Sequence, residues 1–384
     1  MTSKKPPAKP QSQLSSNETA PRKVLSADSH VAEIEACYDE IDPRYRDRRP
    51  IASYDPERGG ALFHVPGFEL AQFVPMGLVC TAGRTPEQFG SPTDWDELHP
   101  GGFDGKHRLT TQDEEGIGAE VIYPSLGLVL CGLPDIDYRK ACFDAYNRWL
   151  LEFVEPDPDR LLAVPIMSLR TPEEGVAEIR AAAEAGFKGV LFSGHAAFDD
   201  YDQPSYDPIW EACASLGLPV SFHILTTPSD NGIAPRGHRI VQHMVMARGV
   251  QDIASMLVFG GVFDRHPQLK VVCAEADAGW VPHFKFRMDH AFETHRHWNR
   301  FTGIDERPSH YVDENIYFTF QNDFSIEHAI GGLNPKRLMW ASDFPHGDGT
   351  YPHSQRVIDR FASLLDGAHH APLFGANLAD LYDL

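Results

Sequence analysis

From residue 118 onward the sequence alternates between short apolar runs and longer amphipathic segments. The runs are rich in β-branched residues and carry few charges, as in residues 118–125 (GAEVIYPS), 161–167 (LLAVPIM) and 188–194 (KGVLFSG). Strands of this composition are buried on both faces, which is the environment of a parallel sheet. Because helices are expected between them, the alternation predicts an α/β fold built from parallel strands.

Eight such strands are predicted when residues 24–33 (VLSADSHVAE) are counted as the first. The others lie at 219–224, 270–277, 316–322 and 337–344. Helices are expected at about 138–153, 171–185, 206–216, 240–259, 281–291 and 355–365. Eight strand–helix units indicate a closed (β/α)8 TIM barrel. An open doubly wound sheet is the alternative, but no glycine-rich phosphate turn follows the first strand.

Two further segments complete the predicted domain organisation. Residues 1–23 are rich in Lys, Pro, Ser and Gln and contain no apolar core of a secretory signal, so we expect a disordered tail. Residues 24–384 form the predicted barrel, with a long insertion after strand one at about 34–117. An insertion of this length either covers one end of the barrel or forms an oligomer contact, and both alternatives remain open.

Charge and cysteine content exclude several classes of protein. The net charge of −21 argues against nucleic acid and anionic membrane surfaces as partners. No apolar run approaches the roughly 20 residues of a membrane span. The six cysteines are scattered without a Cys-x-x-Cys pair, which argues against disulfides and zinc ribbons. We therefore predict a cytoplasmic protein with a small-molecule substrate.

Polar residues interrupt the apolar strands near their carboxyl ends. Asp28 and His30 lie two residues apart on the first strand and so share a face. His223 lies on the fifth strand, Glu275 on the sixth and Asp343 on the eighth. The carboxyl ends of barrel strands meet at one rim, where active sites lie. Buried carboxylates need a cation, and no Lys or Arg interrupts these strand ends, so we predict a divalent metal site.

Three more residues are candidate ligands with alternative roles. Glu33 follows the first strand and either binds a second ion or caps the next helix. His346 follows the eighth strand and either binds metal or orients Asp343. His243, in the helix after strand five, is a further candidate. Carboxylate and imidazole ligands suit zinc, manganese or iron, and the number of ions, one or two, stays open.

These motifs together resemble the amidohydrolase superfamily, in the branch of the aminocarboxymuconate-semialdehyde and resorcylate-type decarboxylases. The resemblance extends from about residue 24 to the C-terminus and rests on residues 28–30 (DSH), His223, residues 275–280 (EADAGW) and residues 341–346 (ASDFPH). It implies a homo-oligomer. It also implies that the metal ligands are Asp28, His30, His223 and Asp343. In the decarboxylases a histidine at the end of strand six is the catalytic acid or base, and Glu275 stands at that position here.

Three functions are compatible with this pattern. The first, which the resemblance favours, is a metal-dependent hydrolase or non-oxidative decarboxylase for a small carboxylated or cyclic compound, with Glu275 or His346 moving protons. The second is a dinuclear iron or iron–manganese oxygenase that hydroxylates its substrate. In that case the second ion would be held by Glu33, His243, Glu275 and His346. The third is a non-catalytic subunit of an assembly with a related enzyme, which missing ligands would indicate, and none is missing.

Overall fold

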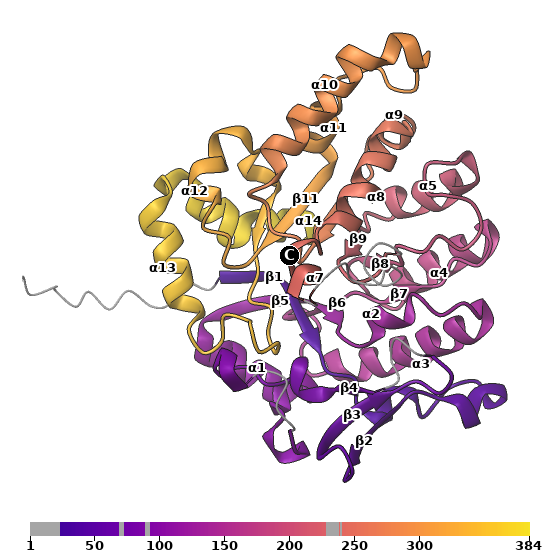
Figure 1. Ribbon diagram of the computed structural model, residues 1–384, viewed down its shortest axis with the longest axis vertical. Helices are drawn as coiled ribbons and strands as arrows, with labels where there is room; N and C mark the ends of the chain where they lie inside the picture. The colour runs from indigo at the N-terminus through magenta and orange to yellow at the C-terminus, as the bar shows by residue number, and fades with distance from the viewer. Residues whose placement is uncertain (1–23, 69–72, 89–92, 228–237, 239) are drawn as a thin grey trace, which may run out of the picture.

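The computed structural model describes residues 24–68, 73–88, 93–227, 238 and 240–384, so the predicted tail at 1–23 lies outside the described residues. Parallel strands form two sheets at the centre of the molecule (Figure 1). The smaller sheet has the order β1 (Val24–Val31), β5 (Ile117–Pro124) and β6 (Leu161–Ala163). The larger has the order β12 (Leu338–Trp340), β11 (Ile316–Phe320), β10 (Val271–Ala274), β9 (Val220–His223), β8 (Val190–Phe192) and β7 (Ile166–Met167).

The two sheets meet at two seams. At one seam, β6 and β7 are consecutive pieces of the predicted strand at 161–167, and Val164 N donates to Ile122 O at 3.1 Å. At the other seam, Asp343 N donates to Asp28 O at 3.0 Å, and His30 N donates to Phe344 O at 2.6 Å. The eight predicted strands therefore follow one another around a ring, as in a (β/α)8 barrel.

Helices surround these strands on the outside of the molecule (Figure 1). Thr171 caps α4 through a hydrogen bond from Glu174 N, and Pro172 is its first residue, as the sequence predicts. Gly186 has a φ of 89°, a conformation that favours glycine after a helix. The long helices are α3 (Ile136–Val154), α4 (Pro172–Glu184), α5 (Asp207–Ser215), α8 (Arg248–Phe259), α10 (Val281–Asn299), α11 (Pro308–Asn315) and α13 (Ser354–Leu364). The short ones are α2 (Gly127–Leu130), α9 (Val262–Arg265), α12 (Ile326–Ala329) and α14 (Asn377–Tyr382).

Two predicted helices have the wrong length. The single helix predicted at 240–259 is two helices, α7 (Ile240–Met244) and α8, and the residues between them include Met246 and Ala247, which line a cavity. The helix predicted to end near residue 291 continues as α10 to Asn299, because no Gly or Pro occurs before Gly303. Helix length at these two places is therefore set by tertiary contacts and by the absence of breakers.

The insertion after strand one has a small sheet of its own. Its antiparallel strands are β2 (Ile51–Asp55), β3 (Gly60–His64) and β4 (Val74–Pro75), which are drawn at the bottom of Figure 1. Helix α1 (Gly105–Glu115) then leads into β5. Ala32 N donates to Gly102 O at 2.7 Å, and Ala82 N donates to Pro345 O at 3.0 Å. The described parts of the insertion therefore contact the loops that follow β1 and β12, at the carboxyl end of the barrel.

The core consists of the strands and the inner faces of the helices. The strand residues of β9 and β10 are fully buried, and Trp210 and Trp340 are the largest buried side chains. All six cysteines are buried and unpaired, as predicted. At the amino end of the barrel, Asn377 of α14 donates to Leu338 O at 2.7 Å. No helix among the described residues has the length and apolar character needed to cross a bilayer.

Candidate metal centre

Five side-chain atoms converge at the carboxyl ends of β1, β9, β10 and β12. His30 Nε2 lies 3.4 Å from Asp28 Oδ1, 3.2 Å from Glu275 Oε2 and 3.2 Å from Asp343 Oδ1. His223 Nε2 lies 3.2 Å from the same Glu275 oxygen and 3.6 Å from Asp28 Oδ1. These five atoms are buried, and none of them has a hydrogen-bond partner in the part of the chain that the structure describes. Buried polar atoms are normally paired, so this cluster needs an explanation.

The hydrogen bonds of the two imidazoles show which ring nitrogen of each carries a proton. His30 Nδ1 lies 2.9 Å from Pro124 O, and His223 Nδ1 lies 2.9 Å from Ile224 O. A carbonyl can only accept, so each Nδ1 carries a proton and donates it. In a neutral ring Nε2 is then a bare lone pair that faces carboxylate oxygens. This orientation of histidine by a carbonyl is typical of metal ligands, and a cation held between Asp28, His30, His223 and Glu275 would satisfy the ligand atoms of these four residues.

The electrostatics of the cluster also favour positive charge. Burial alone lowers the pKa of both imidazoles, but the adjacent carboxylates outweigh it, raising the pKa of His30 well above its ordinary value and that of His223 to about 9. Burial raises the pKa of Asp28 and Glu275, yet the imidazoles reverse this effect and the pKa of Glu275 falls well below its ordinary value. Both carboxyl groups are therefore ionised at neutral pH and ready to bind a cation.

Strained backbone turns two of the carboxylates toward the centre. Glu275 and Asp343 have φ values of 53° and 58°, in the left-handed region that non-glycine residues rarely adopt. Such a conformation costs about 1–3 kcal/mol and persists only where the surroundings hold it. Thr319 Oγ1 accepts from Glu275 N at 2.8 Å and donates to Asp28 Oδ2 at 3.2 Å, so it links the main chain of one ligand to the carboxylate of another. Thr319 was not predicted, because a single Thr in a strand has no distinctive pattern.

His346 lies at the edge of the cluster, where both predicted roles remain available to it. Its Nδ1 lies 2.9 Å from Asp343 Oδ1, its Nε2 lies 2.9 Å from Ser125 Oγ, and its ring stacks on His30 at 4.0 Å. The ligand atoms form two overlapping groups, one with Asp28, His30, His223 and Glu275 and one with His30, Glu275, Asp343 and His346. Because His30 offers a single lone pair, only one group can use it at a time.

Two predicted candidates are not brought into either group. Glu33 is buried, and its carboxylate accepts backbone hydrogen bonds from Ser125, Leu126 and Gly127 at 2.7–3.0 Å. Of its two predicted alternatives, the cap on the helix after strand one is therefore wrong, since Glu33 caps the turn after β5. Its partners lie more than 90 residues away in the sequence, which sequence spacing cannot indicate. His243 lies exposed on α7 and lines the cavity above the cluster.

A buried arginine holds the backbone behind the ligands. Arg108 of α1 is fully buried, and its Nε donates to Glu120 Oε2 at 2.5 Å. Its Nη1 donates to His30 O at 2.8 Å, and its Nη2 donates to Phe344 O at 3.3 Å. Arg108 therefore fixes the main chain beside the ligands His30 and Asp343. Arg108 was not predicted, because it lies in the insertion. The only sequence feature that could have indicated a buried partner is Glu120, a charged residue inside an apolar strand.

A cavity of about 440 Å³ opens above the cluster. Asp28, Glu275 and Asp343 form part of its wall, and the indole of Trp280 lines it at the start of α10. Its volume suits a small organic molecule. The other polar side chains of its lining are His243, Asp277, Thr319, Gln321, Asp323, Ser325 and Asp348. A compound bound here would therefore contact the metal ligands directly.

The parallel barrel and the carboxylate–histidine centre define a metal-dependent enzyme of the hydrolase and carboxy-lyase type. The amidohydrolase family model matches residues 136–384, which is more than half of the chain. The chain therefore belongs to the amidohydrolase family, as its motifs predicted.

Curated and solved relatives agree with this assignment. A gamma-resorcylate decarboxylase from Rhodococcus jostii is 26% identical over 338 residues, covering 81% of this chain and 96% of the relative. An amidohydrolase from Mycobacterium avium subsp. paratuberculosis has a TM-score of 0.79 at 21% identity, covering 95% of this chain and all of that chain. A dihydroxybenzoic acid decarboxylase from Polaromonas with bound manganese has a TM-score of 0.61 at 17% identity, covering 94% and 97%. The two solved structures share the fold, and the Rhodococcus relative is named a decarboxylase, which supports the first of the predicted functions.

Proposed function

We propose that the protein is a metal-dependent non-oxidative decarboxylase that acts on a small carboxylated aromatic compound. The observation that carries this proposal is the set of five buried, unpartnered donor atoms at the floor of the cavity. The decarboxylases among the relatives supply the reaction class, and the manganese in one of them is consistent with the carboxylate-rich ligand set found here. The six unpaired cysteines suit a reducing cytoplasm, where we expect the enzyme to act.

Asp28, His30, His223 and Glu275 would hold the ion, with Asp343 Oδ1 3.2 Å from His30 Nε2. When bound, a divalent ion supplies a Lewis acid that holds a substrate oxygen and stabilises developing negative charge. The cavity walls, including the Trp280 indole, would position an aromatic ring above the ligands. A ring held there would present its carboxylate to the polar floor and its apolar edge to Trp280.

Decarboxylation requires a residue that delivers a proton. Cleavage of the bond between the ring and the carboxylate leaves an electron pair on the ring carbon, and a proton must replace the departing CO₂. Glu275 is poorly suited to this role because its pKa is held well below its ordinary value. His346, whose Nδ1 lies 2.9 Å from Asp343 Oδ1, is better placed to hold and transfer a proton.

One observation favours a second candidate function, hydrolysis. The position that carries a catalytic histidine in the related decarboxylases is Glu275 here, 3.2 Å from both ligand imidazoles. An ionised carboxylate at that point can accept a proton from an attacking water. The substrate would then be a small ester, lactone or amide that fits the same cavity.

A single set of assays tests both candidates. The full chain is loaded with manganese, zinc or iron, its metal content is measured, and it is incubated with 2,6-dihydroxybenzoate, 5-carboxyvanillate and a panel of esters, lactones and anilides. A decarboxylase releases CO₂ and, in D₂O, incorporates one deuterium at the vacated ring carbon. Turnover confined to the ester or lactone panel would support hydrolysis. Oxygen consumption with two equivalents of iron, or failure to bind any metal, would contradict both.

A further inference from the structure

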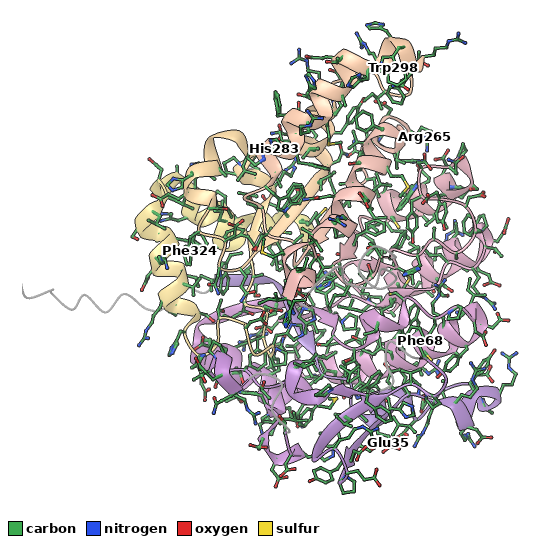
Figure 2. The ribbon with its side chains drawn as sticks, viewed as in Figure 1. Glu35, Phe68, Arg265, His283, Trp298 and Phe324 are labelled. Atoms are coloured by element: carbon green, nitrogen blue, oxygen red, sulfur yellow. The ribbon has the colours of Figure 1, made fainter. Side chains whose placement is uncertain are left out.

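The cavity above the metal ligands has an acidic wall. Beyond the ligand carboxylates, its lining includes Asp277, Asp323 and Asp348, which together form this acidic wall. Figure 2 labels Phe324, the residue after Asp323, on the side of the barrel where α13 lies. Among the described residues, His243 on α7 is the single basic side chain of the lining, and no Lys or Arg contributes to it. The proposed decarboxylation concerns the carboxylate end of the substrate, so it does not account for this wall.

The carboxylates of the acidic wall have no counter-charge within the chain. Asp323 accepts a hydrogen bond from Gly279 N at 2.5 Å, which holds the loop before α10 but supplies no positive side chain. Asp277 accepts a long hydrogen bond from Gln321 N, at 3.4 Å. Neither these two residues nor Asp348 forms an ion pair with a Lys, Arg or His in the part of the chain that the structure describes. The negative charge of the wall is therefore available to a bound molecule.

The floor of the same cavity does not offset this charge. Asp28 and Asp343 line the cavity, and the Oδ1 atom of each is buried with no partner among the described residues, so the cavity is built to hold a ligand. With Glu275, three carboxylates face one divalent ion, and imidazoles bind metal in their neutral form. The ion can hold one substrate carboxylate by direct contact. A second anionic group on the substrate would meet carboxylates alone.

We propose that the acidic wall selects substrates that carry an alkylammonium group at the end opposite the reacting carboxylate, a specificity that rests on the proposed decarboxylation. Carboxylates beside an aromatic face bind alkylammonium groups by ion pairing and cation–π attraction, and the Trp280 indole lines the same cavity. Its Nε1 donates to Ala276 O at 2.8 Å, which fixes the ring. Asp277 and Asp348 determine this specificity, because the Asp323 carboxylate is engaged with backbone N–H groups.

Exposure limits the size of the effect. Asp277 and Asp348 are exposed at the mouth of the cavity, and a single exposed ion pair contributes a factor of only a few. A cleft lined by charge of one sign focuses the field, so the contributions combine. We expect about tenfold in kcat/KM between a cationic and a neutral outer group, and a similar factor between a neutral and an anionic one. Both factors should shrink as sodium chloride is raised from about 20 to about 500 mM.

Three 2-hydroxybenzoates that differ only at carbon 4, opposite the carboxylate, test the proposal on the full manganese-loaded chain. One carries an aminomethyl group, one a hydroxymethyl group and one a second carboxylate. The amine is placed on a saturated carbon because an amine bonded directly to the ring is uncharged at neutral pH. Release of CO₂ gives kcat/KM for each compound, and calorimetry gives Kd for any compound that releases none. The expected order of preference is aminomethyl, then hydroxymethyl, then carboxylate.

Asp277→Asn and Asp348→Asn each remove one negative charge from the wall. Each should lower kcat/KM for the aminomethyl compound and raise it for the dicarboxylate, so that their ratio falls about tenfold and the hydroxymethyl compound responds least. A purely structural role would move all three compounds in the same direction. Asn tolerates the left-handed conformation of Asp277, whose φ is 53°, so the backbone is kept. Asp159→Asn, at an exposed residue outside the cavity lining, is the control and should leave the ratio unchanged.

The outcomes separate this specificity from the proposed reaction. CO₂ release without the expected order, or variants that change the three compounds alike, would overturn the ammonium specificity and leave decarboxylation standing. Tightest binding of the aminomethyl compound without CO₂ release would contradict decarboxylation and support charge selection by the wall. Failure of all three compounds to bind would overturn both. Metal content and melting temperature equal to those of the wild type would show that each variant is folded.

Discussion

Two layers of buried polar groups lie at the carboxyl end of the barrel, and they differ in how they are satisfied. One is a supporting layer, which consists of Arg108 and Glu33. Every charged atom of these two side chains has a hydrogen-bond partner. In the metal cluster, five buried atoms have no such partner among the described residues. Burial alone therefore does not distinguish residues that stabilise the fold from residues that bind a ligand. The two kinds of residue are distinguished by whether their buried polar atoms have hydrogen-bond partners.

The two layers also carry opposite energetic consequences. An unpaired buried polar atom costs about 1–3 kcal/mol, so the cluster opposes folding when neither a cation nor a proton lies between the imidazoles and the carboxylates. The supporting layer stabilises the strand ends and holds the strained backbone at Asp343 through the carbonyl of Phe344. The difference predicts that substitutions in the cluster change metal binding first, while those in the supporting layer change stability first.

Asp343→Asn is expected to have the largest effect on function. The amide keeps the shape but loses the charge that faces His30 Nε2 at 3.2 Å and His346 Nδ1 at 2.9 Å. We expect metal affinity to fall by more than the roughly 10–100-fold typical of outer-shell changes, and activity to be lost with it. Metal titration against a competing chelator measures this. The exposed Asp159→Asn is the control, and an Asp343→Asn protein that kept its metal would contradict the site.

Arg108→Met should produce the largest loss of stability. It leaves Glu120, which lies 2.5 Å from Arg108 Nε, as an unpaired buried charge, and removal of one partner of a buried pair costs about 3–5 kcal/mol. Urea unfolding of the metal-free protein measures it. Arg44→Met, at an exposed ion pair, should leave the midpoint unchanged. Adding Glu120→Leu to Arg108→Met should recover part of the loss, and no recovery would contradict the buried-charge explanation.

Removal of the metal should reveal how the stability contributed by the cluster depends on pH. A ligand present at a hundredfold its dissociation constant contributes about 2.7 kcal/mol, which chelation removes. In the metal-free protein, burial lowers the pKa of His223 but Asp28 and Glu275 raise it from 6.5 to about 9. A raised folded-state pKa adds stability below pH 6.5 that is lost as the pH rises toward 9.

The chelated protein should therefore melt at a lower temperature at pH 9 than at pH 6.5. The loaded protein should show the reverse trend, because protons and metal compete for the same nitrogens. Melting temperatures of both forms across this pH window provide the measurement. Parallel curves for the two forms would mean that the imidazoles do not face the carboxylates as described.

Glu33→Gln should reduce stability and leave metal binding intact. Its carboxylate accepts three backbone hydrogen bonds, and the amide group of Gln would turn a donor toward one of those donors. A loss of about 1–3 kcal/mol is expected. Exposed Glu155→Gln is the matched control. Loss of a metal equivalent from the Glu33 variant would instead make it a ligand of a second ion, against its position in this structure.

The barrel and the metal cluster could both be predicted from the sequence for the same physical reason. Strands buried on both faces are apolar throughout, so a polar residue such as His223 or Asp343 inside or directly after one is conspicuous. The residues of the supporting layer show no such pattern in the sequence. Glu33 meets Ser125 and Arg108 meets Phe344 across more than 90 and 200 residues, and only the folded chain brings them together. The break between α7 and α8 was also unpredictable, because the residues 245–247 contain no helix breaker.

The smallest predicted effect belongs to Thr319, which lies between the two layers. Its hydroxyl is fully paired, yet both of its partners, Glu275 N and Asp28 Oδ2, belong to metal ligands. Thr319→Val keeps the shape and removes both bonds, so we expect a stability loss of about 1 kcal/mol together with roughly tenfold weaker metal binding. Thr319→Ser, which restores the hydroxyl, should recover metal affinity. If Thr319→Val lost stability but bound metal as tightly as the wild type, Thr319 would belong to the supporting layer, and the ligand carboxylates would be held by the strand ends alone.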